Sequence, residues 1–275
     1  MAPTKRGCAV CGKPAEQRCS ACGSAGLEMF YCSPEHQKLL WFVHKRVCGP
    51  SAQKPHFRFP PLTATEARLA KENLHAPWAP PNRQITLAKV LLNLLKSPSP
   101  VDLPALIDGL TTSGTSAYGP ERTAELTCYV RDAVFQDFAP PDFSSVPPGE
   151  VPAEVYEPIT GLSNFAAGFA LSLPPHPAGL PRFYVREAWY TQLMHRMLTY
   201  HALKYLIRRQ ELGLEKTPKG ELERCYRGAM SGMGVWLGEL AKEGTDIGGA
   251  VLRAMDMSGA EPEEMIATAK RGGFA

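Results

Sequence analysis

Apolar residues spaced three or four positions apart recur along most of the chain after residue 62. This spacing places them on one face of an α-helix, and prolines and helix-capping residues separate one such run from the next. The pattern predicts helices over residues 63–75, 85–96, 103–110, 120–138, 186–212, 218–242, 247–255 and 261–270. No run alternates apolar and polar residues as a half-buried strand does, so we expect a mostly all-α domain.

Three stretches depart from this pattern. Residues 51–62 and 139–153 are rich in proline and predict extended connections. Residues 159–181 carry no charge, and both a helix and a buried loop suit them. The expected organisation is a unit over residues 1–50, a linker over 51–62 and a helical domain over 63–275.

The first 50 residues hold most of the cysteines. Six of the eight fall there, and with two histidines they form four pairs. The pairs are Cys8 with Cys11, Cys19 with Cys22, Cys32 with His36, and His44 with Cys48. A C-x-x-C turn directs two thiolates at one ion, and a four-residue offset places two ligands on one helix face. Eight such ligands are the number that two tetrahedral zinc ions require.

Local signals around the third pair indicate a strand followed by a helix. Residues 28–31 predict a short strand, and Ser33, Pro34 and Glu35 form a helix start that leads to Cys48. Three disulfides are the alternative to zinc, but they would leave the histidine spacing unexplained. They would also need an oxidising compartment. The N-terminal residues MAPTKRG lack the apolar core of a signal peptide, so we expect an intracellular protein of the nucleus or cytoplasm.

The run CAVCGKPAEQRCSACGSAGLEMFYCSPEHQKLLWFVHKRVC, residues 8–48, resembles a MYND-type zinc finger, especially the fungal versions. The resemblance implies a cross-brace with a short hairpin and a helix, in which pairs one and three share one zinc and pairs two and four share the other. The implied ligands are Cys8, Cys11, Cys32 and His36 for one ion, and Cys19, Cys22, His44 and Cys48 for the other. With four ligands each, both Zn²⁺ ions would be structural. His36 stands where most members carry cysteine, and Leu40 where many carry an acidic residue.

MYND fingers are protein-interaction modules that bind short proline-rich peptides. The resemblance therefore implies a partner protein with a proline-rich motif, with transcriptional regulation as one setting for its recruitment. Gln37 and Trp41 match the family's peptide-contacting pair and share one helix face. A core position is the alternative for Trp41, and a solvated position is the alternative for Gln37.

Charge argues against nucleic-acid binding. Residues 1–50 carry seven Lys or Arg and three Asp or Glu, a formal +4. Six zinc-bound thiolates and two Zn²⁺ would add −6 and +4, which leaves about +2 and no dense basic stripe. The uncharged residues 159–181 are interrupted by prolines, so we expect no membrane span.

No catalytic motif is evident, and we expect no enzymatic activity. Some MYND proteins are lysine methyltransferases, but there the finger lies inside a SET domain, and here it begins at residue 8. The helical part lacks a phosphate-binding loop, an H-E-x-x-H motif and a nucleophile elbow. His195 and His201 are six positions apart and do not share a face, so we expect satisfied or exposed histidines. Cys128 and Cys225 occupy apolar helical positions, where packing is expected.

Two functional hypotheses remain. The first is a non-enzymatic adaptor whose zinc finger recruits a partner peptide while the helical part makes a second contact. The alternative is an uncharacterised enzyme or small-molecule binder in the helical part, with the finger as an accessory module. In both cases we expect the helical part to stay folded without zinc, because its apolar helices provide their own core.

Overall fold

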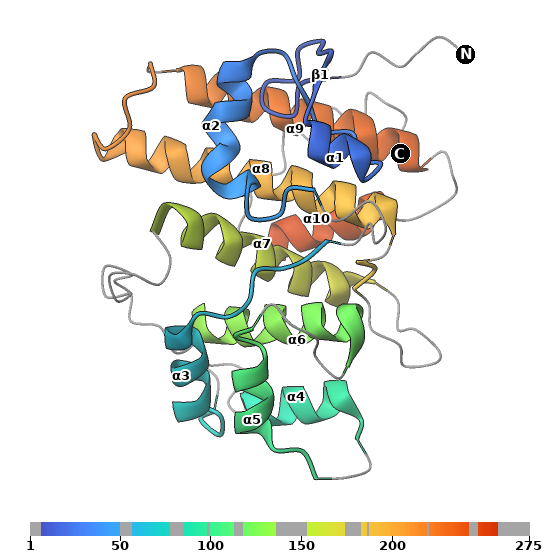
Figure 1. Cartoon of the computed structure of the whole chain (residues 1–275), viewed down its shortest axis with the longest axis vertical. Coiled ribbons are helices and arrows are strands. Elements are labelled where there is room, and N and C mark those ends of the chain that lie inside the picture. The colour runs from blue at the N-terminus through green and yellow to red at the C-terminus, as the bar shows by residue number, and fades with distance from the viewer. Residues whose placement is uncertain are drawn as a thin grey trace.

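A computed structural model shows a small N-terminal unit resting on a stack of helices (Figure 1). It describes residues 7–49, 57–77, 85–97, 100–112, 118–135, 153–173, 183–185, 187–218, 220–241 and 247–257. The N-terminal unit holds a two-stranded sheet and two helices, and the rest of the described chain is helical. This confirms the predicted fold class.

The N-terminal unit is built on a short antiparallel pair of strands. Its elements are β1 (Gln17–Arg18), α1 (Ser20–Ser24), β2 (Phe30–Tyr31) and α2 (Pro34–His44). The predicted start of α2 is confirmed, since the Ser33 side chain accepts a hydrogen bond from the His36 backbone N–H and Pro34 occupies the first turn. The short helix α1 was not predicted, because only five residues form it.

Eight helices make up the described portion of the larger part. They are α3 (Ala64–Glu72), α4 (Leu87–Leu95), α5 (Leu103–Gly109), α6 (Gly119–Ala133), α7 (Ala153–Ser172), α8 (Ala188–Glu211), α9 (Glu221–Ala241) and α10 (Ile247–Met257). Seven of the predicted helices are present, with ends shifted by a few residues. The predicted helix over residues 261–270 lies outside the described residues, as do residues 139–152 of the predicted connection and residues 136–138 at the predicted end of α6.

Helix α7 decides the described portion of the ambiguous stretch, since residues 159–172 are helical, while residues 174–181 lie outside the described residues. It packs against α6 on one side and α8 and α10 on the other (Figure 1). Phe165 and Phe169 are fully buried in this position. Gly161 allows the ring of His201 to approach α7, because a Cβ there would lie 2.5 Å from the His201 Nδ1 atom. A helix buried on nearly every side needs no polar face, which is why the sequence showed no helical periodicity there.

The apolar core is continuous between the N-terminal unit and the helices. One cluster of buried side chains runs from Cys8 through Phe30 and Val43 into α7, α8, α9 and α10. The described end of the predicted linker joins it: Phe57 and Phe59 are buried, and the Phe57 backbone N–H donates to the Val185 carbonyl over 3.1 Å. A second cluster of buried apolar side chains is formed by residues of α3, α4, α5 and α6.

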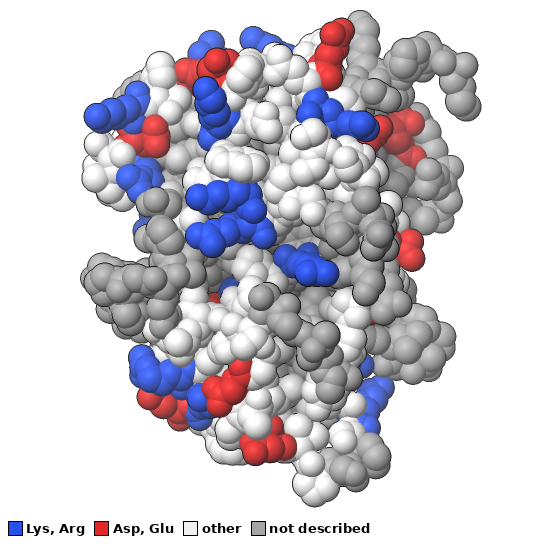
Figure 2. Space-filling view, in the orientation of Figure 1, with Lys and Arg blue, Asp and Glu red and all other residues white. Residues whose placement is uncertain are grey.

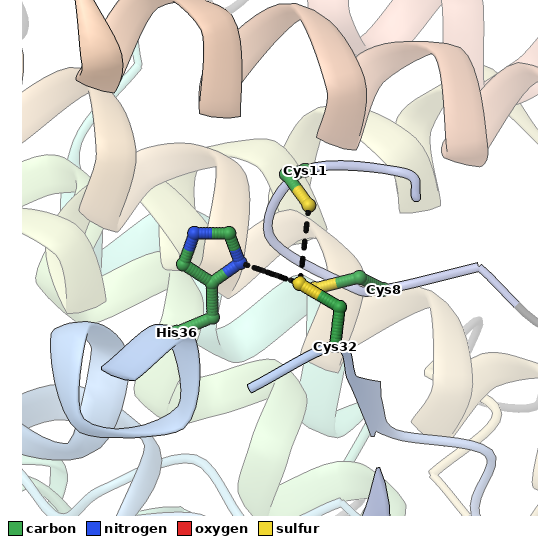
Figure 3. A group of neighbouring side chains, drawn as sticks. All are labelled: Cys8, Cys11, Cys32 and His36. Atoms are coloured by element: carbon green, nitrogen blue, oxygen red, sulfur yellow. Dashed lines mark hydrogen bonds between the residues drawn. The ribbon is translucent and has the colours of Figure 1, made fainter. Parts of the chain in front are cut away.

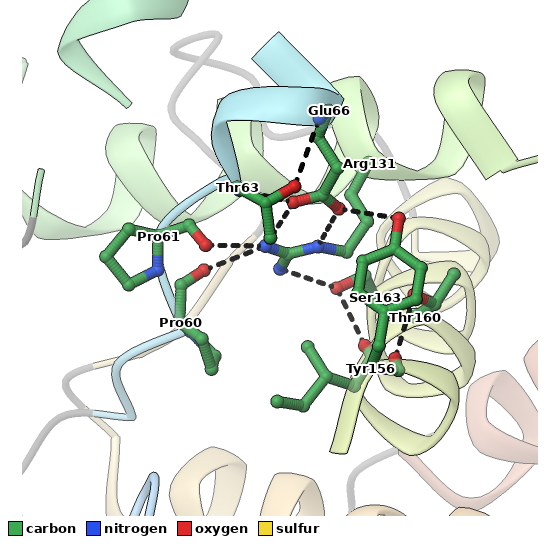
Figure 4. A network of polar contacts seen from close by, with 9 residues as sticks. Pro60, Pro61, Thr63, Glu66, Arg131, Tyr156, Thr160 and Ser163 are labelled. Atoms are coloured by element: carbon green, nitrogen blue, oxygen red, sulfur yellow. Dashed lines mark hydrogen bonds and ion pairs between the residues drawn. The ribbon is translucent and has the colours of Figure 1, made fainter. Parts of the chain in front are cut away.

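A buried polar network joins the lower helices to α7 (Figure 4). Nε of Arg131 on α6 donates to a Glu66 carboxylate oxygen over 2.6 Å, and its Nη2 donates to the carbonyls of Pro60 and Pro61 at 3.1 and 2.8 Å. The Tyr156 hydroxyl donates to the same carboxylate over 3.2 Å. Both charges of this network therefore have partners, which is the condition under which burial of a charge is tolerated.

The described surface carries both signs of charge. On the face in Figure 2, acidic and basic side chains are interspersed at the top and bottom, with a small basic group near the middle. None of the described helices combines the length and apolar composition needed to cross a membrane.

Candidate metal centres

Four side chains from three segments converge to form the first ligand group, called site 1 (Figure 3). Cys8 and Cys11 come from the turn before β1, Cys32 follows β2, and His36 lies in the first turn of α2. The Cys11 and Cys32 sulfurs are 3.6 Å apart, and the His36 Nδ1 atom lies 3.2 Å from the Cys32 sulfur and 3.5 Å from the Cys8 sulfur.

A second group, called site 2, lies between α1 and the end of α2. It comprises Cys19, Cys22, His44 and Cys48. The Cys19 and Cys48 sulfurs are 3.5 Å apart, and the His44 Nε2 atom lies 3.5 Å from the Cys22 sulfur. Helix α2 thus carries one histidine for each site, near opposite ends.

Both groups have the dimensions of a tetrahedral zinc site. With zinc–ligand bonds of about 2.1–2.3 Å, neighbouring ligand atoms should be roughly 3.4–3.8 Å apart. The closest contacts within the two groups run from 3.2 to 4.0 Å, and all four ligand atoms of each group lie within 4.8 Å of one another. A disulfide would bring sulfurs to about 2.05 Å, so the disulfide alternative does not fit. The cross-brace pairing and two structural Zn²⁺ ions follow from these groups.

Tight turns place the cysteine pairs. In the first turn the Cys8 backbone N–H donates to the Lys13 carbonyl over 2.7 Å, and Gly12 adopts φ +69°. In the second turn the Gly23 N–H donates to the Cys19 carbonyl over 2.8 Å. The left-handed conformation at Gly12 favours glycine, because a side chain would be strained there.

The pKa values of the histidine and cysteine side chains in the two groups suit the binding of Zn²⁺. Burial lowers the pKa of His36, and it lowers the pKa of His44 to about 4, so both imidazoles are neutral as metal ligands must be. Burial and the neighbouring thiols raise the pKa of Cys11 to about 12 and that of Cys48 to about 11. A Zn²⁺ ion supplies the positive charge that turns such thiols into thiolates.

The two residues expected to contact a peptide lie on one face of α2. Trp41 is 45% exposed, and the centroid of its indole is 5.9 Å from that of the His44 ring. Gln37 is half-buried one turn earlier. The alternative of a buried packing residue therefore does not apply to Trp41.

One of the two histidines of α8, His195, differs from the expectation of a satisfied or exposed ring. The ring of His195 is neither exposed nor hydrogen-bonded within the described part of the chain. It packs against Phe57 at 5.3 Å and against the site 2 ligand His44 at 5.5 Å between centroids. His201 is half-buried beside α7, and neither histidine joins a metal-binding group among the described residues.

One contact between the finger and the helices was missed by the sequence analysis. The Gln192 side chain of α8 pairs with the Glu28 backbone: Oε1 accepts from its N–H and Nε2 donates to its carbonyl, both over 2.9 Å. These residues are 164 positions apart. The only hint is an amide side chain among the apolar residues of α8.

Comparison with known proteins supports the same assignment for the N-terminal unit. Residues 8–48 match the family model of the MYND finger, which leaves most of the chain outside the match. No curated protein and no solved structure matched the chain. The matched segment and the two ligand groups cover the same residues, and this part of the chain is a MYND-type zinc finger.

Proposed function

We propose that the protein is a non-enzymatic adaptor whose finger recruits a partner through a proline-rich peptide, while the helical part makes a second contact. The MYND finger is a zinc-binding protein-interaction module. Transcriptional regulation is a suitable setting for such an adaptor, since recruitment there depends on short linear segments. The proposal concerns the exposed face of α2.

The observation that carries the proposal is the exposed indole of Trp41. A flat apolar ring offers a surface to a proline side chain, and the Gln37 amide offers both a donor and an acceptor to a peptide backbone. A proline-rich peptide is already extended, so ordering it costs less conformational entropy than ordering an ordinary chain.

The opposite face of α2 keeps this surface rigid. Leu40, Val43 and His44 are buried, and α2 packs against α7 and α8. A preorganised surface loses little entropy on binding, but one short peptide covers little area. We therefore expect a dissociation constant on the order of tens to hundreds of micromolar.

A peptide titration tests the proposal. A proline-rich peptide added to the ¹⁵N-labelled chain should shift amide signals near residues 29–41, and Trp41→Ala should abolish these shifts while both zinc ions are retained. Leu92→Ala is the matched control, because Leu92 is 47% exposed on α4, at the end of the molecule opposite the finger (Figure 1).

Binding by Trp41→Ala as strong as that of the wild type would refute the proposal. So would a peptide that shifts no signal near the finger. If a small molecule were to bind the helical part while proline-rich peptides do not bind, the competing hypothesis of an enzyme or small-molecule binder would be favoured instead.

A further inference from the structure

The orientation of His36 leaves one ring nitrogen facing away from site 1. Its Nδ1 atom points at the ligand group, 3.2 Å from the Cys32 sulfur. A neutral imidazole that offers Nδ1 to a metal carries its proton on Nε2. That N–H needs an acceptor, because ligating histidines usually donate their second nitrogen to a neighbouring group.

The group that faces Nε2 comes from the helical part. The Cys225 sulfur on α9 lies 3.8 Å from the His36 Nε2 atom, across 189 positions of sequence. Cys225 is buried and His36 is half-buried. Sulfur is a weak acceptor with a large radius, and the separation suits a long N–H···S contact.

Helix α9 touches a second ligand of site 1 through its backbone. A Cβ built on Gly228 would lie 2.1 Å from the Cys11 carbonyl oxygen, and one built on Gly12 would lie 2.6 Å from the Gly228 carbonyl oxygen. The turn that carries Cys11 therefore rests directly on α9. Cys225 and Gly228 are three positions apart and share one helix face.

We propose that Cys225 is a positioning residue for site 1: its sulfur accepts the Nε2–H of His36, holds the ring with Nδ1 toward the zinc, and makes retention of that zinc depend on helix α9. His44 of site 2 contacts the helical part through the ring of His195, which donates and accepts no hydrogen bond among the described residues. The two zinc ions should thus respond differently to changes in α9. This inference does not rest on peptide recruitment.

Zinc retention by three variants of the full chain tests the proposal. Native mass spectrometry with increasing chelator should show that Cys225→Ala loses one zinc ion about 10–100-fold more readily than the wild type, since outer partners of metal ligands contribute on this scale. Cys225→Ser keeps a hydrogen-bond acceptor, so it should lose zinc more readily than the wild type but less readily than Cys225→Ala. Cys128→Ala is the matched control: Cys128 is also a buried helical cysteine, but it lies on α6 and belongs to neither ligand group.

The ring signals of His36 and His44 identify the weakened site. Equal loss of both zinc ions in Cys225→Ala, or loss equal to that in Cys128→Ala, would overturn the proposal. Should Cys225→Ala fail to fold, the ¹⁵N ring spectrum of the wild type decides. A His36 ring with zinc on Nδ1 and a slowly exchanging proton on Nε2 supports the proposal, and zinc on Nε2 overturns it.

Discussion

Arg131 shows how one buried charge can hold several segments together. Its side chain is 2% exposed and contacts Glu66 on α3, the carbonyls that precede α3, and the Ser163 hydroxyl on α7 at 3.4 Å. The guanidinium stays charged at any accessible pH. Removing it would leave the Glu66 carboxylate buried without its counter-charge.

We expect Arg131→Ala to lower the free energy of unfolding by about 3–5 kcal/mol, the usual effect of breaking a buried ion pair. Arg68→Ala is the matched control, because Arg68 pairs with Glu72 over 2.8 Å with its side chain 57% exposed. An exposed pair contributes about 0–1 kcal/mol. Urea unfolding followed by circular dichroism measures the free energy of unfolding of both variants. A similar loss of stability in the two would contradict the structural role assigned to the buried Arg131–Glu66 pair.

At the scale of elements, α9 is shaped to fit the finger. Glycine lowers the stability of a helix interior by about 1 kcal/mol relative to alanine, and α9 contains several glycines. At Gly228 the cost has a structural reason, since the Cys11 turn occupies the place of a side chain. At Gly232, one turn later, no neighbouring atom lies within 4 Å of the position that a Cβ would take.

Alanine substitutions at these two glycines should therefore have opposite effects on the stability of the protein. Gly228→Ala should force α9 away from the Cys11 turn, lower the melting temperature and loosen the zinc of site 1. Gly232→Ala should raise the free energy of unfolding by about 0.5–1 kcal/mol through helix propensity alone. Thermal unfolding and zinc retention are the measurements, and a neutral Gly228→Ala variant would show that the close approach is not required.

At the scale of the molecule, the continuous core links the finger to the helices. Helix α2 packs on α7 and α8, Gln192 binds the Glu28 backbone, and Phe57 packs against His195 in the shared core. Zinc binding by such a finger contributes on the order of 10–16 kcal/mol of apparent free energy, and that energy is folding energy. The shared core argues against the expectation that the helical part is indifferent to zinc.

Removing zinc should consequently weaken the helical part as well. With a strong chelator, we expect the melting temperature of the helical signal to fall by about 2–4 °C for each 1 kcal/mol of stability that the shared core loses, which is the usual shift for a chain of this size. Circular dichroism with and without chelator measures the shift, and added zinc should restore it. An unchanged helical transition would show that the two parts fold independently.

Much of this protein could be predicted from local sequence. The spacing of cysteine and histidine over residues 8–48 predicts four ligand pairs, enough for two zinc ions, and the resemblance to MYND fingers implied which pairs share an ion. The expectation that four-residue pairs share a helix face was wrong, because Cys32 precedes α2 and Cys48 follows it. Amphipathic helices such as α4 were equally predictable, since each exposes one face and buries another.

Only the tertiary structure decided how these parts meet. The helical state of α7 depends on burial between α6, α8 and α10, and burial on nearly every side removes the periodicity that identifies a helix. The contacts of Gln192 with Glu28 and of Cys225 with His36 join residues 164 and 189 positions apart. Such pairs arise when packing brings distant faces together, and no local spacing in the sequence encodes them.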